Sequence, residues 1–139
     1  MAKLFDTHAH YTDERLFGNE ELLSEIFAGD VGNIVTVAVD TEDSAKCVSL
    51  ANAHENMFCS VGIHPSEIDK VSDIPAEVAK LEKYLADKKC VAIGEAGLDY
   101  YWAKEYAAEQ KKLFDRQLAL AAESGMPIIV HDRCARRHL

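Results

Sequence analysis

The sequence lacks several features that would place it in common classes of protein. Its apolar runs stay well below the roughly 18 residues that a membrane-spanning helix needs, and no charged-then-apolar leader opens it. Its four cysteines lie far apart without a Cys-x-x-Cys pair, which argues against a zinc knuckle and against a disulfide framework. We therefore expect a protein of the reduced, cytoplasmic interior with no membrane partner.

Basic residues and the usual nucleophile motifs are also scarce. Lys and Arg number 15 against 24 Asp and Glu, a net charge of −9, which disfavours a broad basic groove for nucleic acid. This charge does not exclude an enzyme that holds a phosphodiester locally through metal ions. The sequence has no Gly-x-Ser-x-Gly elbow and no cysteine in a loop beside a likely base, so a Ser or Cys nucleophile has little support.

What the sequence does have is an alternation of short β-rich runs with longer amphipathic ones. Strands are predicted at Lys3–His8, Asn33–Val39, Met57–Ile63, Lys89–Glu95 and Pro127–His131. Helices are predicted at about Asn19–Gly29, Asp43–Glu55, Pro75–Asp87 and Ala103–Ser124. In the last helix one buried stripe is expected, formed by Tyr106, Gln110, Leu113, Phe114, Gln117, Leu118 and Ala121. Mostly apolar strands are typical of a parallel sheet covered on both faces.

Two α/β architectures fit this alternation. An open doubly wound sheet of five strands suits 139 residues, but it usually carries a Gly-rich turn after the first strand, where this chain has Asp-Thr-His-Ala-His (6–10). A closed (β/α)₈ barrel needs eight units and typically about 250 residues. We therefore expect an α/β fold, a TIM-like (β/α)₈ barrel of the metal-dependent hydrolase type, truncated here to about five strands and four helices.

Polar residues stand where four of the predicted strands end. They are His8 and His10, His64, Glu95 and His131. Because burying such groups without partners or a metal costs several kcal/mol each, their gathering at one edge of a parallel sheet indicates chemistry. Residues two apart on a strand share a face, so His8 and His10 can approach one ion together.

The sequence indicates a role for some of these residues more clearly than for others. Asp6 lies on the same side as the two histidines and suits a group that orients an imidazole. Glu95 follows an apolar run and suits a carboxylate bridging two cations, which lie about 3.5–4 Å apart in two-metal hydrolases. His131 fits a ligand or a satisfied core histidine. For His64, a contact to substrate phosphate and direct ligation fit equally well, while the loop aromatics Tyr100 and Tyr101 suit base stacking or simple packing.

Five segments together resemble the TatD family of metal-dependent hydrolases, whose best-studied members are deoxyribonucleases. These segments are Phe-Asp-Thr-His-Ala-His (5–10), Val-Gly-Ile-His-Pro (61–65), Gly-Glu-Ala-Gly-Leu-Asp-Tyr-Tyr (94–101), Gln-x-x-x-Phe-x-x-Gln-Leu-x-Leu-Ala (110–121) and Pro-Ile-Ile-Val-His-Asp-Arg (127–133). The opening Asp-x-His-x-His alone would also suit other amidohydrolase-like barrels or a phosphoesterase of the polymerase-and-histidinol-phosphatase type. The segment around Glu95 is far more selective.

The resemblance implies a binuclear centre of divalent cations (Mg²⁺, Mn²⁺ or Zn²⁺) and DNA as the substrate. By motif match, His8 and His10 would bind the first metal, Glu95 would bridge as the catalytic carboxylate, and His131 would bind the second. The family's later His and Asp ligands have no counterpart here. Alternatives are therefore an inactive fragment, or a small-molecule amidohydrolase on the same barrel.

The last residues depart from the family pattern. We expect residues 1–133 to form the N-terminal part of a single barrel domain, and 134–139 (Cys-Ala-Arg-Arg-His-Leu) to be an aberrant tail. A two-nucleotide deletion within codons for Asp-Ala-His-Asp-Asp-Ile can yield Cys-Ala-Arg-Arg-His, so a frameshift or truncation is the hypothesis. The full-length form is expected to be monomeric, whereas the fragment, with open sheet edges, is expected to self-associate.

Overall fold

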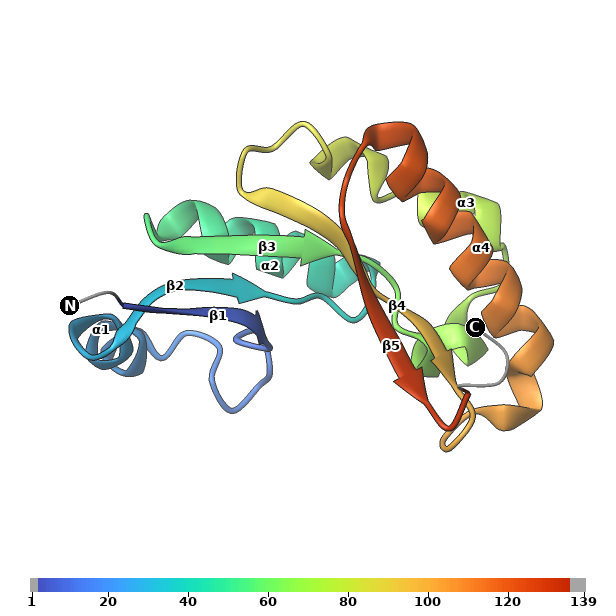
Figure 1. The fold of residues 1–139 in the computed structure, drawn as a ribbon, viewed down its shortest axis with the longest axis horizontal. Helices are drawn as coiled ribbons and strands as arrows, with labels where there is room; N and C mark the ends of the chain where they lie inside the picture. The colour runs from blue at the N-terminus through green and yellow to red at the C-terminus, as the bar shows by residue number, and fades with distance from the viewer. Residues whose placement is uncertain (1–2, 136–139) are drawn as a thin grey trace.

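The structure, a computed structural model, describes residues 3–135 and contains one five-stranded parallel sheet in the order β1-β2-β3-β4-β5 (Figure 1). The strands are β1 (Leu4–Ala9), β2 (Val31–Thr36), β3 (Met57–Val61), β4 (Cys90–Asp99) and β5 (Ile128–Arg133). The helices are α1 (Glu20–Ala28), α2 (Thr41–Ala53), α3 (Ile74–Ala79) and α4 (Ala107–Ser124), with 3₁₀ turns η1 (Pro65–Lys70), η2 (Glu82–Tyr84) and η3 (Lys104–Tyr106). The expected strands and helices are thus present, in sequential order as in a (β/α) barrel. Residues 136–139 of the expected tail lie outside the described residues.

Side-chain caps explain where the helices begin. The carboxylates of Asp40 and Asp73 accept the backbone N–H of Asp43 and Ala76, and so satisfy free donors in the first turns of α2 and α3. At its C-terminal end, α4 stops at Gly125, which takes a left-handed conformation with φ 67°.

The third predicted helix is divided in the structure, and its second part is the 3₁₀ turn η2. Val78 and Leu81, three residues apart, are both fully buried. The backbone N–H of Leu81 bonds to the carbonyl of Val78, and that of Tyr84 bonds to the carbonyl of Leu81. In a 3₁₀ turn residues at this spacing eclipse one another, so the tighter winding brings both apolar side chains to the core.

The buried stripe of α4 differs from its prediction at three positions, one of which is Phe114, which is only half-buried. Gln110, Leu113, Gln117, Leu120 and Ala121 are buried. Tyr106 and Leu118, which we expected in the stripe, are 38% and 37% exposed. Tyr106 belongs to η3 rather than to α4, and Leu118 stands one residue, or about 100°, beyond Gln117 on the helix, so Leu120 takes its place in the core.

The outer helices cover the middle of the sheet better than its edges. In Figure 1, α2 runs behind β3, and α4 lies beside β4 with α3 next to it, in agreement with the packed pairs of elements. The edge strands remain open: Leu4 and Phe5 of β1 are 66% and 52% exposed, and Val130 of β5 is 47% exposed. The expectation that both faces of the strands are covered therefore holds for the centre and is wrong for β1 and β5.

Strand β4 continues four residues beyond its predicted end at Glu95. It pairs with β5 from Ile93↔Ile128 to Asp99↔Arg133, so Asp99, which stands beyond the predicted end, lies in a strand and is 1% exposed. Gly97 permits this close pairing, because a Cβ at its position would lie 2.0 Å from the backbone oxygen of His131.

Among the described residues, no helix is long and apolar enough to cross a membrane.

Candidate metal centre

Glu95 lies at the centre of the site, and its two carboxylate oxygens face different partners. Oε2 is 3.2 Å from Nε2 of His8 and 3.8 Å from Nε2 of His10. Oε1 is 3.0 Å from Nδ1 of His131. The side chain is nearly buried, and its backbone N–H bonds to the carbonyl of Ala38, which holds this part of β4 against the segment that follows β2.

These contacts define two groups of possible metal ligands that share Glu95. His8, His10 and Glu95 form one group, which we call the His8–His10 cluster. His64, Glu95 and His131 form the other, the His64–His131 cluster. Within each group the candidate ligand atoms lie within 4.8 Å of one another, a spacing over which one cation could contact all three. The structure thus brings together the four expected metal ligands and adds His64.

In the His8–His10 cluster, the hydrogen bond of His10 indicates which of its ring nitrogens could bind a cation. Nδ1 of His10 is 2.9 Å from the carbonyl oxygen of Val37, which only accepts, so this nitrogen carries the proton. The lone pair of the neutral ring is then on Nε2, the atom that faces Glu95. A histidine that donates to a carbonyl on one side and offers a lone pair on the other is the usual arrangement of a metal-binding imidazole.

His131 shows the same arrangement with a carboxylate as the supporting group. Its Nε2 is 3.1 Å from Oδ2 of Asp99, so a neutral ring keeps its proton on that side and presents the Nδ1 lone pair to Glu95. Sequence analysis missed Asp99 in this role. Its signal was the spacing: Glu95, Gly97 and Asp99 alternate along one strand and therefore face the same way.

His64 is held in the opposite protonation pattern. Its Nδ1 accepts the backbone N–H of Ser66 at 3.1 Å and lies 2.7 Å from the Ser66 hydroxyl, so the proton of the neutral ring is on Nε2. That Nε2–H points at Nδ1 of His131, 3.0 Å away. In this tautomer His64 is a hydrogen-bond donor to the site. Ser66, the second residue that sequence analysis missed, could have been recognised from its position just after His64-Pro65.

Asp6 contacts backbone rather than a ring. Its Oδ1 accepts the N–H of His8 at 3.1 Å, which stiffens the His-x-His segment. No contact from Asp6 to an imidazole is present among the described residues, so its expected orienting role stays a prediction.

Two buried glutamines of α4 hold backbone on both sides of the site. The amide of Gln117 makes two bonds to Ile63, donating to its carbonyl at 2.9 Å and accepting its N–H at 2.8 Å. Gln110 makes the same pair of contacts with Asp99, at 2.9 and 2.8 Å. Ile63, which precedes His64, and Asp99, which supports His131, are therefore both hydrogen-bonded to α4. These bonds fix the distance between the two backbone segments.

Electrostatics favour the charged carboxylates and the neutral imidazole of His64. Burial raises the pKa of Glu95, but its contact with His131 and the nearby rings of His64 and His8 outweigh this and lower the pKa overall. Asp99 is similar: burial raises its pKa, and backbone N–H bonds from Trp102 and Tyr101 lower it further than burial raises it. Burial, followed by the neighbouring His131, lowers the pKa of His64.

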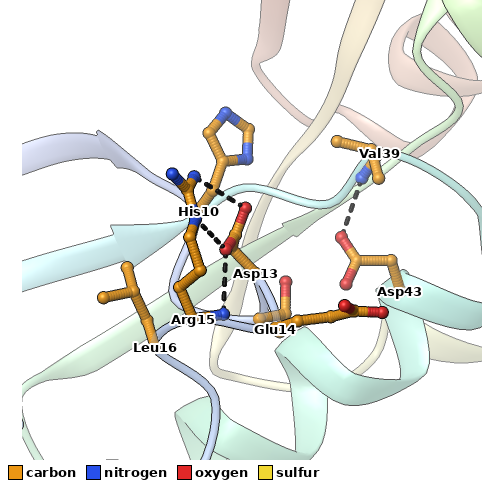
Figure 2. Close-up of a pocket in the computed structure, with 8 residues that line it drawn as sticks. His10, Asp13, Glu14, Arg15, Leu16, Val39 and Asp43 are labelled. Atoms are coloured by element: carbon orange, nitrogen blue, oxygen red, sulfur yellow. Dashed lines mark hydrogen bonds and ion pairs between the residues drawn. The ribbon is translucent and has the colours of Figure 1, made fainter.

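A cavity of about 450 Å³ opens beside His10. In Figure 2, Asp13 and Arg15 lie next to His10 and are joined to each other by dashed lines, and Asp43 lies on the other side of the pocket. In this ion pair Nε of Arg15 is 2.8 Å from Oδ1 of Asp13. The hydrogen bonds from Arg15 lower the pKa of Asp13 to about 2. A volume of this size is in the range of small-ligand sites and adjoins the His8–His10 cluster directly.

A parallel (β/α) sheet that gathers histidines around one carboxylate at its carboxyl edge is the arrangement of a metal-dependent hydrolase. Comparison with known proteins supports this class. The model of the TatD-related DNase family matches residues 5–139, and the chain belongs to that family, as its motifs indicated.

Over the aligned region, two relatives are identical to this chain at about a third of the positions. The uncharacterized metal-dependent hydrolase YabD of Bacillus subtilis is 36% identical over 95% of the chain and 51% of its own length. A 3′-5′ ssDNA/RNA exonuclease TatD of Cronobacter sakazakii is 31% identical over 95% of the chain and 50% of its own length. The chain thus spans about half the length of the curated relatives it matches.

The fold matches a solved structure over nearly the whole chain. YjjV, a TatD homolog from Escherichia coli, superimposes with a TM-score of 0.91 at 30% identity, over 99% of this chain and 54% of that one. The expectation of a TIM-like barrel fold, represented here by five strands, is confirmed.

Proposed function

We propose that this chain carries the greater part of a binuclear metal centre that hydrolyses phosphodiester bonds in single-stranded nucleic acid. The observation that carries the proposal is the orientation of Glu95, whose Oε2 faces His8 and His10 and whose Oε1 faces His131. One carboxylate shared between two groups of histidines suits a bridge between two cations. The exonuclease name of the Cronobacter relative supports the substrate class.

The residues present fit divalent cations by their chemistry. Nε2 of His10 and Nδ1 of His131 are lone-pair atoms by virtue of the partners on their other nitrogens, and the lowered pKa keeps Glu95 anionic. His8 adds a third imidazole near Oε2. When bound, divalent cations polarise a scissile phosphate and lower the pKa of an attacking water. Imidazole and carboxylate ligands suit Zn²⁺ as well as Mn²⁺, so the metal is to be identified by measurement.

In this proposal His64 donates a hydrogen bond to a substrate phosphate oxygen. Its Nδ1 is occupied by Ser66, and its Nε2–H points into the space beside Glu95 and His131. A phosphate oxygen accepts such a bond, whereas a cation repels the proton. Asp6 stiffens the backbone of His8, and Asp99 fixes the ring of His131.

The test compares the 139-residue chain with a length-restored version. We expect the restored protein to bind two cations and to shorten a labelled oligothymidylate, with activity abolished by EDTA and returned by Mg²⁺, Mn²⁺ or Zn²⁺. We expect the chain alone to bind metal more weakly. Cleavage that persists in EDTA would contradict the proposal, and turnover of amide but not phosphodiester substrates would favour the amidohydrolase alternative.

We further propose that residues 1–133 form one side of a closed barrel and that the chain on its own self-associates. Strands β1 and β5 each have one paired edge among the described residues, and each exposes apolar side chains. Open edges of this kind pair with other chains. Light scattering tests this: a monomer for the chain alone would contradict it, and a monomer for the length-restored protein is expected.

A further inference from the structure

A group of exposed side chains at the carboxyl end of β4 and β5 has no part in the metal centre. Tyr101 and Trp102 are 58% and 65% exposed, although large aromatic side chains usually lose most of their surface on folding. Their rings meet edge to face, with centroids 4.6 Å apart. The guanidinium of Arg133 lies 4.3 Å from the centre of the Tyr101 ring and 5.5 Å from that of Trp102. We call these three residues the Trp102 platform.

The platform is tied to the metal centre through a single carboxylate. Oδ1 of Asp99 accepts the backbone N–H groups of Tyr101 and Trp102, at 3.0 and 2.9 Å. Oδ2 of the same group contacts Nε2 of His131 at 3.1 Å. Arg133 follows His131 by two residues on β5, so their side chains leave the same face of the strand. A ligand on the platform would therefore continue toward the metal centre.

The guanidinium of Arg133 carries a charge that no carboxylate of residues 3–135 pairs with. Within the same residues, this guanidinium contacts the rings of Tyr101 and Trp102. In a chain with a net charge of −9, a cation placed among exposed aromatic rings suits a ligand that combines a flat apolar face with an anion. An unpaired nucleotide has both parts, because its base stacks on aromatic side chains and its phosphate pairs with Arg.

We propose that the Trp102 platform is a stacking subsite for an unpaired base of the substrate strand, with Arg133 contacting a phosphate. The inference rests on the proposed function and names where the strand lies outside the metal centre. Stacking needs a base whose face is free, so the subsite selects single strands over duplexes while tolerating any base.

Trp102 is the only tryptophan in the sequence, so intrinsic fluorescence reports on the platform directly. The experiment titrates the 139-residue chain in EDTA with a short oligothymidylate and with an abasic oligomer of equal length and charge. We expect the oligothymidylate to quench Trp102 and the abasic oligomer to leave its emission unchanged. Equal quenching by both oligomers, or none by either, would overturn the proposal. Because no cleavage occurs in EDTA, the result does not depend on activity.

Matched variants provide a second measurement. Tyr101→Leu should weaken the oligothymidylate affinity about fivefold or more, since base stacking on an aromatic ring is lost. Tyr106→Leu removes an exposed tyrosine that lies outside the platform and should leave the affinity unchanged. Both side chains are exposed, so neither substitution disturbs the core. Equal effects of the two variants would assign the quenching to something other than the platform.

Discussion

The two ligand clusters share Glu95 but differ in how firmly their histidines are held. The side chains of His8 and His10 are 40% and 42% exposed, whereas that of His131 is 19% exposed. His10 has one supporting bond, to the carbonyl of Val37, and His8 has none besides Glu95 among the described residues. In the other cluster, His131 is supported by the carboxylate of Asp99 and His64 by Ser66.

The difference arises from the strands that carry the ligands. His8 and His10 stand at the end of β1, an open edge of the described sheet, while Asp99 and His64 lie beside backbone that the glutamines of α4 hold. A ligand held in place before the metal arrives loses less conformational entropy on binding. We therefore expect His131 to lose less conformational entropy than His8 or His10 when a cation binds to this chain.

The substitution with the largest expected effect removes what the clusters share. Glu95→Gln in the length-restored protein should lower turnover by about 100- to 1000-fold. An uncharged amide is a poor bridge between two cations, and bound cations stabilise the charge of the transition state by several kcal/mol. Elemental analysis should show less metal bound at both positions. Glu105→Gln in η3, an exposed carboxylate outside the site, is the matched control. Full metal occupancy with unchanged turnover would show that Glu95 is not the bridge.

Asp99→Asn should affect one cluster only. Loss of the carboxylate that supports a metal-binding histidine typically costs about 10- to 100-fold in metal affinity, and we expect this for the cation at His131 with little change at His8 and His10. Isothermal titration with Mn²⁺ or Zn²⁺ resolves the two affinities. Asp115→Asn on the outer side of α4 should change neither. Equal weakening of both cations would show that the clusters are not independent.

His64→Ala should have the smallest effect on metal and a moderate effect on turnover. A hydrogen bond to a charged group contributes about 1.5–3 kcal/mol, so loss of its donor should lower turnover of the length-restored protein by about 10- to 100-fold while both metal equivalents remain. The control is His54→Ala, at the end of α2. If one metal equivalent disappears with His64, that residue is a ligand and the tautomer inferred from Ser66 is wrong.

The prediction from sequence was strongest where one residue carries its own signal. Glu95, His8, His10 and His131 each stand where a predicted strand ends, and the structure places these histidines in two groups that share Glu95. Asp99 and Ser66 do not stand where a predicted strand ends, and their signal is only their spacing from Glu95 and His64; their importance comes from the ring that each one contacts. Tyr101 was expected in an aromatic pair with Tyr100, yet its partner is Trp102, since Tyr100 is half-buried.

The sequence by itself determined the strand–helix alternation, the parallel sheet and the family, because hydrophobic periodicity and short motifs are local properties. It also determined which side chains could bind a metal. Only the tertiary structure decided that one carboxylate faces both groups of histidines, that β4 extends to Asp99, and that His64 presents a proton where His10 and His131 present lone pairs. These features depend on the register between β4 and β5 and on contacts between residues far apart in the chain, which no local pattern records.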